Sequence, residues 1–319
     1  MFFAVLWIVL GLALLVAGGE LLVRSATRIA QFLRVSPSVI GLTVVAAGTS
    51  MPEMVVSIQA AVSGNTALSV GNVVGSNIFN IGAILGIAAL IAPLRIHSNT
   101  VRMEWPVMFL ATGLLHLLAR DGTLDRLEGG FFVVGFVLFT VFVIRIARHD
   151  LTPVEATEYV ETLPAPADAS GRAWLWNSAL FVAGCGLLVL GADRLVAGAI
   201  HIAETAGVSQ VTIGLTIVAA GTSLPELAAS AVASFRGRDD IAVANIIGSN
   251  IFNILGILGV TAAIHPLPIP EAVIARDDWW MIGFALVLLP FMHTSSRVVR
   301  LEGAALLAGF AVYLGFLLG

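Results

Sequence analysis

Lysine is absent from this chain of 319 residues, and charged residues of all kinds make up only 11% of it. The single cysteine, Cys185, excludes an intrachain disulfide and a metal site built from cysteines. A net charge of -4 gives no basis for nucleic-acid binding. Hydrophobic residues make up 58% of the chain and the mean hydropathy is +0.99. These values indicate a membrane protein rather than a soluble domain.

Long apolar runs fill most of the sequence, and a helix needs about 20 apolar residues to cross a bilayer. The runs predict an all-α membrane protein of ten transmembrane helices, at 2–23, 37–62, 68–92, 104–119, 129–147, 174–193, 211–235, 241–264, 279–293 and 301–318. Residues 149–173 are polar and rich in proline and alanine, which predicts a mobile linker. The linker separates a first half, 1–148, from a second half, 174–319.

The arginine residues predict the orientation of these helices. With the N-terminus outside, the inner loops hold most of them: Arg24, Arg28, Arg34, Arg95, Arg102, Arg145, Arg148, Arg172, Arg236, Arg238, Arg297 and Arg300. The outer loops then hold Arg120, Arg126, Arg194 and Arg276. The positive-inside rule therefore predicts that both termini lie outside.

One stretch of sequence occurs twice, at a constant offset of 173 residues. GLTVVAAGTSMPEM at 41–54 matches GLTIVAAGTSLPEL at 214–227, and GNVVGSNIFNIG at 71–82 matches ANIIGSNIFNIL at 244–255. An odd number of predicted helices separates matching points, so the two copies must lie in opposite orientations. Two inverted five-helix repeats are typical of transporters that work by alternating access.

Each copy places a proline and a glutamate in the middle of an apolar span, as Pro52–Glu53 and Pro225–Glu226. A proline kinks or breaks a helix, and we expect this to free backbone carbonyls ahead of the break, at Ala46, Thr49, Ala219 and Thr222. A carboxylate at this depth costs about 3 kcal/mol. A protonated structural glutamate is the alternative, but two in register beside broken helices favour an ion site.

The residue types around the two glutamates indicate which ions they bind. Carboxylates, carbonyls and hydroxyls without histidine or cysteine suit Ca²⁺ or Na⁺ rather than zinc or copper. Two carboxylates neutralise one Ca²⁺, whereas sodium ions need further neutral oxygens, which serine hydroxyls supply: Ser50, Ser76, Ser223 and Ser249. Exchange of one Ca²⁺ for a larger number of sodium charges would be electrogenic.

The second repeated element, GSNIFN, adds a polar face to each copy. Ser76 and Asn80 are four residues apart, as are Ser249 and Asn253, so each pair shares one face of a helix. Ordinary helix packing is the alternative reading, because small and amide residues join membrane helices. Beside the glutamate motif, ligation is the reading that we favour for the two serines.

The GTSMPE/GTSLPE and GSNIFN pairs resemble the two alpha-repeats of the cation/calcium exchanger superfamily. They are most similar to its sodium/calcium exchanger branch in small prokaryotic form. The resemblance covers the whole chain, with alpha-repeats at 37–93 and 210–266. It implies a core made of the second, third, seventh and eighth helices. It also implies that two long slanting helices, the first and the sixth, slide past this core.

The resemblance also implies the ion ligands. The calcium site falls on Glu53 and Glu226 with backbone oxygens of Thr49 and Thr222. The sodium sites fall on Ala46, Ser50, Ser76, Ala219, Ser223 and Ser249, and the central position on Asn80 and Asn253. Potassium-dependent members carry Asp at the place of Asn253, so the resemblance implies exchange that does not depend on potassium.

The sequence thus predicts a secondary antiporter that exchanges Na⁺ for Ca²⁺, with H⁺/Ca²⁺ exchange on the same scaffold as the alternative. A repeat within one chain argues against a passive channel, and no nucleophile–base set supports an enzyme, so we expect neither catalysis nor a cofactor. The expected partners are the lipid bilayer and the two ions, without nucleic acid or an obligatory protein partner. The short linker and the resemblance predict a multi-pass protein of the prokaryotic plasma (inner) membrane.

Overall fold

The computed structural model describes residues 2–33, 35–149, 170–207, 219–294 and 296–318, and almost all of them are helical. The α-helices of the first half are α1 (Phe2–Leu33), α2 (Pro37–Ile40), α3 (Ala46–Thr49), α4 (Met51–Val62), α5 (Thr66–Phe79), α6 (Gly86–Ile91), α7 (Trp105–Leu118) and α8 (Arg126–His149). Those of the second half are α10 (Gly171–Thr205), α12 (Ala219–Gly221), α13 (Leu224–Phe235), α14 (Asp239–Ile251), α15 (Gly259–Ile264), α16 (Asp278–Thr294) and α17 (Arg300–Leu318).

Short π-helices interrupt several of these helices. They are η1 (Gly41–Val45), η2 (Asn80–Leu85), η3 (Thr100–Glu104), η6 (Phe252–Leu258) and η7 (Val273–Asp277), and one 3₁₀ turn, η4 (Ala119–Asp121), follows α7. A π turn adds a residue to the helix and is frequent at functional sites. η2 and η6 hold the last asparagine of GSNIFN in each repeat, so the irregular turns occur in matching places.

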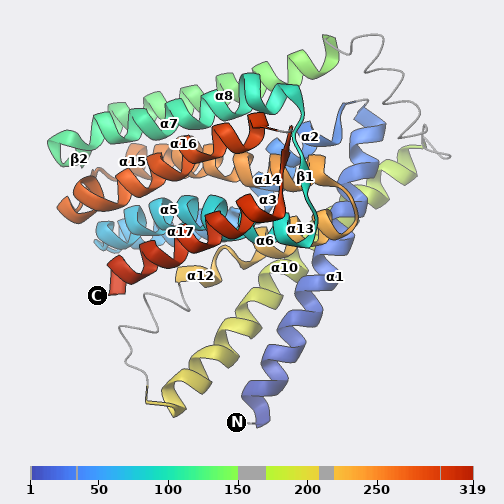
Figure 1. Cartoon of the computed structure of the whole chain (residues 1–319), viewed down its shortest axis with the longest axis horizontal. Helices are drawn as coiled ribbons and strands as arrows, with labels where there is room; N and C mark the ends of the chain where they lie inside the picture. The colour runs from blue at the N-terminus through green and yellow to red at the C-terminus, as the bar shows by residue number, and fades with distance from the viewer. Residues whose placement is uncertain (1, 34, 150–169, 208–218, 295, 319) are drawn as a thin grey trace.

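The long helices α1 and α10 pack against each other and run obliquely to the other helices (Figure 1). Glycines allow this contact, because an added Cβ at Gly18 would lie 2.8 Å from the backbone nitrogen of Leu188. The matching Cβ at Gly191 would lie 2.8 Å from the backbone nitrogen of Leu15. Membrane helices commonly associate through such small residues. The expected pair of long slanting helices is therefore present.

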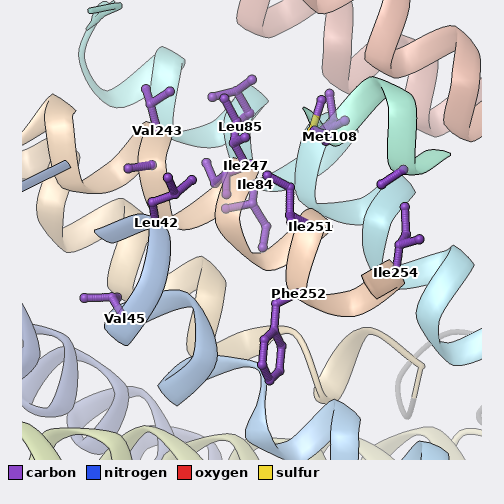
Figure 2. Close-up of a cluster of buried hydrophobic side chains, with 14 of the residues drawn as sticks. Leu42, Val45, Ile84, Leu85, Met108, Val243, Ile247, Ile251, Phe252 and Ile254 are labelled. Carbon is purple, nitrogen blue, oxygen red and sulfur yellow. The ribbon is translucent and has the colours of Figure 1, made fainter. Parts of the chain in front are cut away.

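The third and eighth predicted spans form the centre of the fold. The most apolar window of the Asp239–Ile264 segment is 100% buried and that of Thr66–Ile91 is 72% buried, against 17% for Arg300–Leu317. Figure 2 shows apolar side chains of α14 and η6 beside those of η1, η2 and α7: Val243, Ile247, Ile251, Phe252, Ile254, Leu42, Val45, Ile84, Leu85 and Met108. These two segments position the polar site described below.

Two small antiparallel ribbons connect the two halves. β1 (Leu94–Arg95) pairs with β4 (Arg297–Val298), and β2 (Thr123–Leu124) pairs with β3 (Leu267–Pro268). The expectation of an all-α chain is wrong at these strands, because two residues are too few to show an alternating pattern. Each strand of the first half pairs with a strand of the second half, so the ribbons join the ends of the helices across the two halves.

Six helices of the described ranges are long and apolar enough to cross a membrane, or seven if the bent pair Pro37–Thr49 and Met51–Val62 forms one span. The predicted count of ten spans and the outside position of the termini stay predictions. Part of the predicted linker, 150–169, and part of the second alpha-repeat, 210–218, lie outside the described residues. α10 already begins at Gly171, within the segment predicted as linker.

Candidate ion-binding site

Each repeat contains a helix break directly ahead of its Pro-Glu pair. In the first repeat α3 ends at Thr49 and α4 begins at Met51, and the segments on either side are bent by 45°. In the second repeat the gap between α12 and α13 lies at the equivalent place. Pro52 and Pro225 therefore lie in the first turn of the following helix, where a missing N–H leaves no bond unmade. The expected helix breaks are present, just before the prolines.

The two glutamates meet at the contact between the repeats. Glu53 and Glu226 lie in the first turns of α4 and α13, and each is 1% exposed. Ser50 Oγ donates to Glu226 Oε1 at 2.7 Å, and Ser223 Oγ donates to Glu53 Oε1 at 2.9 Å. Each serine therefore binds the carboxylate of the other repeat rather than its own, and the N-terminal end of each helix favours the negative charge there.

Five side-chain oxygens of the predicted ligands are buried and have no hydrogen-bond partner among the described residues: Glu53 Oε2, Glu226 Oε2, Asn80 Oδ1, Asn253 Oδ1 and Ser249 Oγ. Leaving a buried polar atom unpaired costs about 1–3 kcal/mol, so such atoms are uncommon in protein interiors. All five are hard oxygen donors of the kind that suit Na⁺ and Ca²⁺. The arrangement is chemically fit to bind a cation between the two repeats.

The donor set contains few charged groups. Among the described residues there is no group of three or more His, Cys, Asp or Glu side chains that could hold a metal ion. Neutral amide, hydroxyl and carbonyl oxygens must therefore complete any coordination shell around Glu53 and Glu226. Oxygen ligands of these kinds suit Na⁺ or Ca²⁺ better than a transition metal.

The amides of Asn80 and Asn253 are held from outside the ligand set. Asn80 Nδ2 donates to Asn250 Oδ1, and Asn253 Nδ2 donates to Asn77 Oδ1, both at 3.0 Å. Because the nitrogen of each amide is engaged, its oxygen is the atom that stays available. All four asparagines are buried, and each of these two hydrogen bonds joins one repeat to the other.

The remaining predicted ligands differ between the repeats. Ser76 Oγ and Ser223 Oγ are hydrogen bonded at 3.1 Å, whereas the counterpart of Ser76, Ser249, has a buried hydroxyl without a partner in the described structure. The carbonyl of Ala46 accepts the N–H of Ser50 at 3.0 Å, so the break does not free it as expected. In the second repeat Ser223 N–H donates instead to the carbonyl of Ala220, and the carbonyl of Ala219 does not receive that bond.

Two asparagines outside the predicted ligand set hold the threonines of the broken helices. Thr49 Oγ1 donates to Asn245 Oδ1 at 3.4 Å, and Thr222 Oγ1 donates to Asn72 Oδ1 at 3.3 Å. The amide nitrogens of Asn72 and Asn245 then each bond a serine hydroxyl one helix away, Ser57 and Ser230, at 3.0 Å. The offset of 173 relates Asn72 to Asn245, and a polar residue kept in both copies of an apolar repeat was the signal that could have found them.

Comparison with known proteins finds relatives that match this chain over almost its whole length. The model of the family described as sodium/calcium exchanger protein matches residues 3–145 and 176–319. The putative antiporter CaxA of Alkalimonas amylolytica is 42% identical, over 98% of each chain. The sodium/calcium exchanger MaX1 of Methanosarcina acetivorans is 33% identical, over 96% of each chain. A structure of the sodium-calcium exchanger NCX_Mj, soaked with Na⁺ and without Ca²⁺, matches with a TM-score of 0.83 at 30% identity, covering 98% of each chain.

Proposed function

This chain belongs to the sodium/calcium exchanger protein family, and from that premise we propose that it is an antiporter that exchanges Na⁺ for Ca²⁺ across the membrane. The observation that carries the proposal is the pair of buried carboxylates, Glu53 and Glu226, each bound by a serine of the other repeat. Carboxylates at this depth are expensive unless they serve a function. Their unpartnered oxygens supply the negative charge that a cation needs.

We assign Ca²⁺ to the two carboxylates together with the backbone oxygens of Thr49 and Thr222. Sodium ions take neutral oxygens on either side of this position, and the proposed ligands are Ala46, Ser50, Ser76, Ala219, Ser223 and Ser249, with Asn80 and Asn253 at the centre. The exchange is electrogenic in this proposal, because the carboxylates balance one Ca²⁺ but not a larger sodium charge. An amide at Asn253 in place of a carboxylate supports independence from potassium.

The proposed mechanism is alternating access by two inverted repeats, at 37–93 and 210–266, within halves 1–148 and 174–319. The reciprocal contacts support it: Ser50 binds Glu226 as Ser223 binds Glu53. A pseudo-two-fold relation gives such pairs, since residue i of one unit then contacts residue j of the other and the reverse. We further propose ten spans, both termini outside, and a place in the prokaryotic inner membrane.

The test is calcium uptake into proteoliposomes loaded with sodium, with choline replacing external sodium at matched pH. We expect uptake that requires the outward sodium gradient, responds to membrane potential and is unchanged when potassium is removed. Glu53→Gln should abolish this uptake at calcium concentrations near the native KM. Glu128→Gln is the matched control, because Glu128 is half-buried at the start of α8, outside the proposed ligand set, and accepts a capping hydrogen bond from Asp125 N–H. Uptake that ignores sodium would contradict the proposal.

Proton/calcium exchange is the second candidate. The buried carboxylates support this candidate, because Glu53 and Glu226 can each carry a proton in place of a bound ion. The same vesicles distinguish the two functions when a pH gradient is imposed without sodium. Uptake that follows the pH gradient and not the sodium gradient would assign the chain to proton coupling, and the sodium ligands above would then be wrong.

A further inference from the structure

Two asparagines of the GSNIFN motifs, Asn77 and Asn250, lie beside the predicted ligands without belonging to them. Both are 1% exposed. Asn250 Oδ1 accepts the amide N–H of Asn80, and Asn77 Oδ1 accepts the amide N–H of Asn253, at 3.0 Å in each case. Each therefore contacts the central asparagine of the other repeat. These contacts decide which end of each central amide is engaged.

Asn77 and Asn250 are themselves fixed by the opposite ends of their amides. Asn77 Nδ2 donates to the carbonyl of Asn250 at 3.4 Å and to Met281 Sδ at 3.7 Å. Asn250 Nδ2 donates to the carbonyl of Asn77 at 3.5 Å and to Met108 Sδ at 3.6 Å. A side-chain amide has one acceptor end and one donor end. With both ends occupied, neither Asn77 nor Asn250 can turn over without breaking bonds.

These contacts fix the orientation of the side-chain amides of Asn80 and Asn253. Their nitrogens are held, and their oxygens are buried without a partner in the described structure. A rotation of 180° about the last side-chain bond would place two N–H donors where the oxygen now lies. N–H donors repel a cation, whereas an amide oxygen binds Na⁺ or Ca²⁺.

We propose that Asn77 and Asn250 are positioning residues that turn the amide oxygens of Asn253 and Asn80 toward the transported cation. The proposal rests on the exchange function proposed above. It deepens that function, because each repeat then orients a ligand of the other repeat. Neighbours that orient metal ligands commonly contribute about ten- to a hundredfold to metal affinity.

The experiment replaces a cation-binding amide by a carboxylate, a side chain that presents an oxygen in either orientation. A carboxylate has two equivalent oxygens, so Asn80→Asp makes the choice of atom irrelevant. Asn250→Leu keeps the volume of the side chain and removes the acceptor. We would measure the calcium KM and the maximal rate of sodium-dependent uptake for the native protein, for each single variant and for the double variant. The same set is made in the other repeat, with Asn77→Leu and Asn253→Asp.

We expect Asn250→Leu to raise the calcium KM about tenfold or more in the native background. In the Asn80→Asp background the same substitution should raise it much less. A role in packing alone would cost the same in both backgrounds, and that result would overturn the proposal. The proposal would also be overturned if Asn250→Leu alone left the calcium KM of the native protein unchanged. If Asn250→Leu does not yield a monodisperse protein, the set in the other repeat carries the same test.

Direct binding separates this inference from the proposed function. Calcium that binds the folded protein raises its unfolding temperature, and this shift needs no sodium coupling. If native vesicles show no sodium-dependent uptake, the exchange proposal fails. The calcium-induced shifts in unfolding temperature of the native protein, the single variants and the double variants still measure the orientation effect. If uptake is normal and those shifts fall equally with and without Asn80→Asp, only the orientation inference fails.

Discussion

The packing between α1 and α13 differs from the packing between their counterparts, α10 and α4. Along the first pair, an added Cβ at Gly19 would lie 3.0 Å from the side chain of Val232, so the two helices are in close contact. Arg236 Nε donates to Glu20 Oε2 at 2.8 Å at the end of this contact. Within the described residues α10 makes no comparable contact with α4. Val55 on α4 is 50% exposed, and in the described part of the chain Asp193 on α10 forms an ion pair with its neighbour Arg194, at 3.7 Å.

The difference teaches that the serine–carboxylate contacts at the centre of the molecule are symmetric while the helix packing at its edges is not. The contacts of Glu53 and Glu226 are repeated across the halves, but only one of two equivalent helix pairs is closed. With the predicted orientation, the closed pair lies on the inner side of the site. Under the alternating-access mechanism proposed above, the inverted repeats would exchange the two arrangements, and the structure would represent one of the two states.

The largest effect on transport is expected at the two carboxylates, Glu53 and Glu226, whose serine contacts are the same in both repeats. Glu53→Gln and Glu226→Gln each remove a charge that the other repeat binds through Ser223 or Ser50. We expect each to lower calcium affinity by about 100-fold, which corresponds to about 3 kcal/mol. The measurement is the calcium KM of sodium-dependent calcium uptake, with Glu128→Gln as the control. Equal losses from the two variants would sharpen the symmetry, and a loss confined to one would contradict it.

The next effect concerns the crossing of α1 and α10. Gly18→Ala and Gly191→Ala each force a Cβ to within 2.8 Å of a backbone nitrogen, of Leu188 and of Leu15. We expect each to destabilise the fold by about 2 kcal/mol, the usual cost of overpacking. Thermal unfolding in detergent measures it. Gly186→Ala on the same helix is the matched control, since nothing lies within 4 Å of its added Cβ. Matched losses at the two sites and none at the control are the expected outcome.

Much of the fold and part of the site could be predicted from the sequence. The offset of 173 identified the repeats and the paired Pro-Glu motifs. The family resemblance implied a core that includes the third and eighth spans, and both are largely buried. The sequence could not show that Ser50 binds Glu226 rather than Glu53, because that bond depends on how two distant segments pack. The same limit hid the contacts of Asn72 and Asn245, which local spacing does not encode.

The carbonyl of Ala46 shows a second limit. Pro52 was expected to free this carbonyl, but the helix breaks two residues earlier, at Ser50, and the N–H of Ser50 still donates to Ala46. The backbone conformation of Ser50, with ψ near 9°, is what ends the helix. Proline position therefore predicts that a helix breaks but not which hydrogen bond is lost. The role of the Ala46 carbonyl as a sodium ligand stays a prediction.

A smaller effect is expected from the serines that bridge the repeats. Ser50→Ala removes one hydrogen bond to a carboxylate, and Ser223→Ala removes a similar bond together with the contact to Ser76. We expect the sodium KM to rise about tenfold for Ser50→Ala, since a bond to a charged group contributes about 1.5 kcal/mol or more. Ser223→Ala should cost more. Ser69→Ala is the control, because Ser69 is buried without a partner in the described structure. Identical losses at Ser50 and Ser223 would contradict the role of the Ser76 contact.

The smallest effect is expected at the ion pair between Arg236 and Glu20, which is formed between α13 and α1. Arg236→Ser removes the ion pair with Glu20 and places there the residue found at the equivalent position, Ser63. The Arg236 side chain is 51% exposed, so the pair contributes at most about 1 kcal/mol, or about fivefold in the balance of the two states.

The direction of this last effect follows from which side the pair closes. Loosening α1 from α13 should raise the apparent calcium affinity measured from the inner side and lower it from the outer side, because more of the protein is then competent to bind from within. Vesicles of both orientations measure the two affinities. Ser63→Arg is the opposing variant, since it places a cation where Asp193 of the equivalent pair can reach it when α10 closes on α4. Shifts in opposite directions would establish that this single pair sets the asymmetry, and shifts in the same direction would assign it elsewhere.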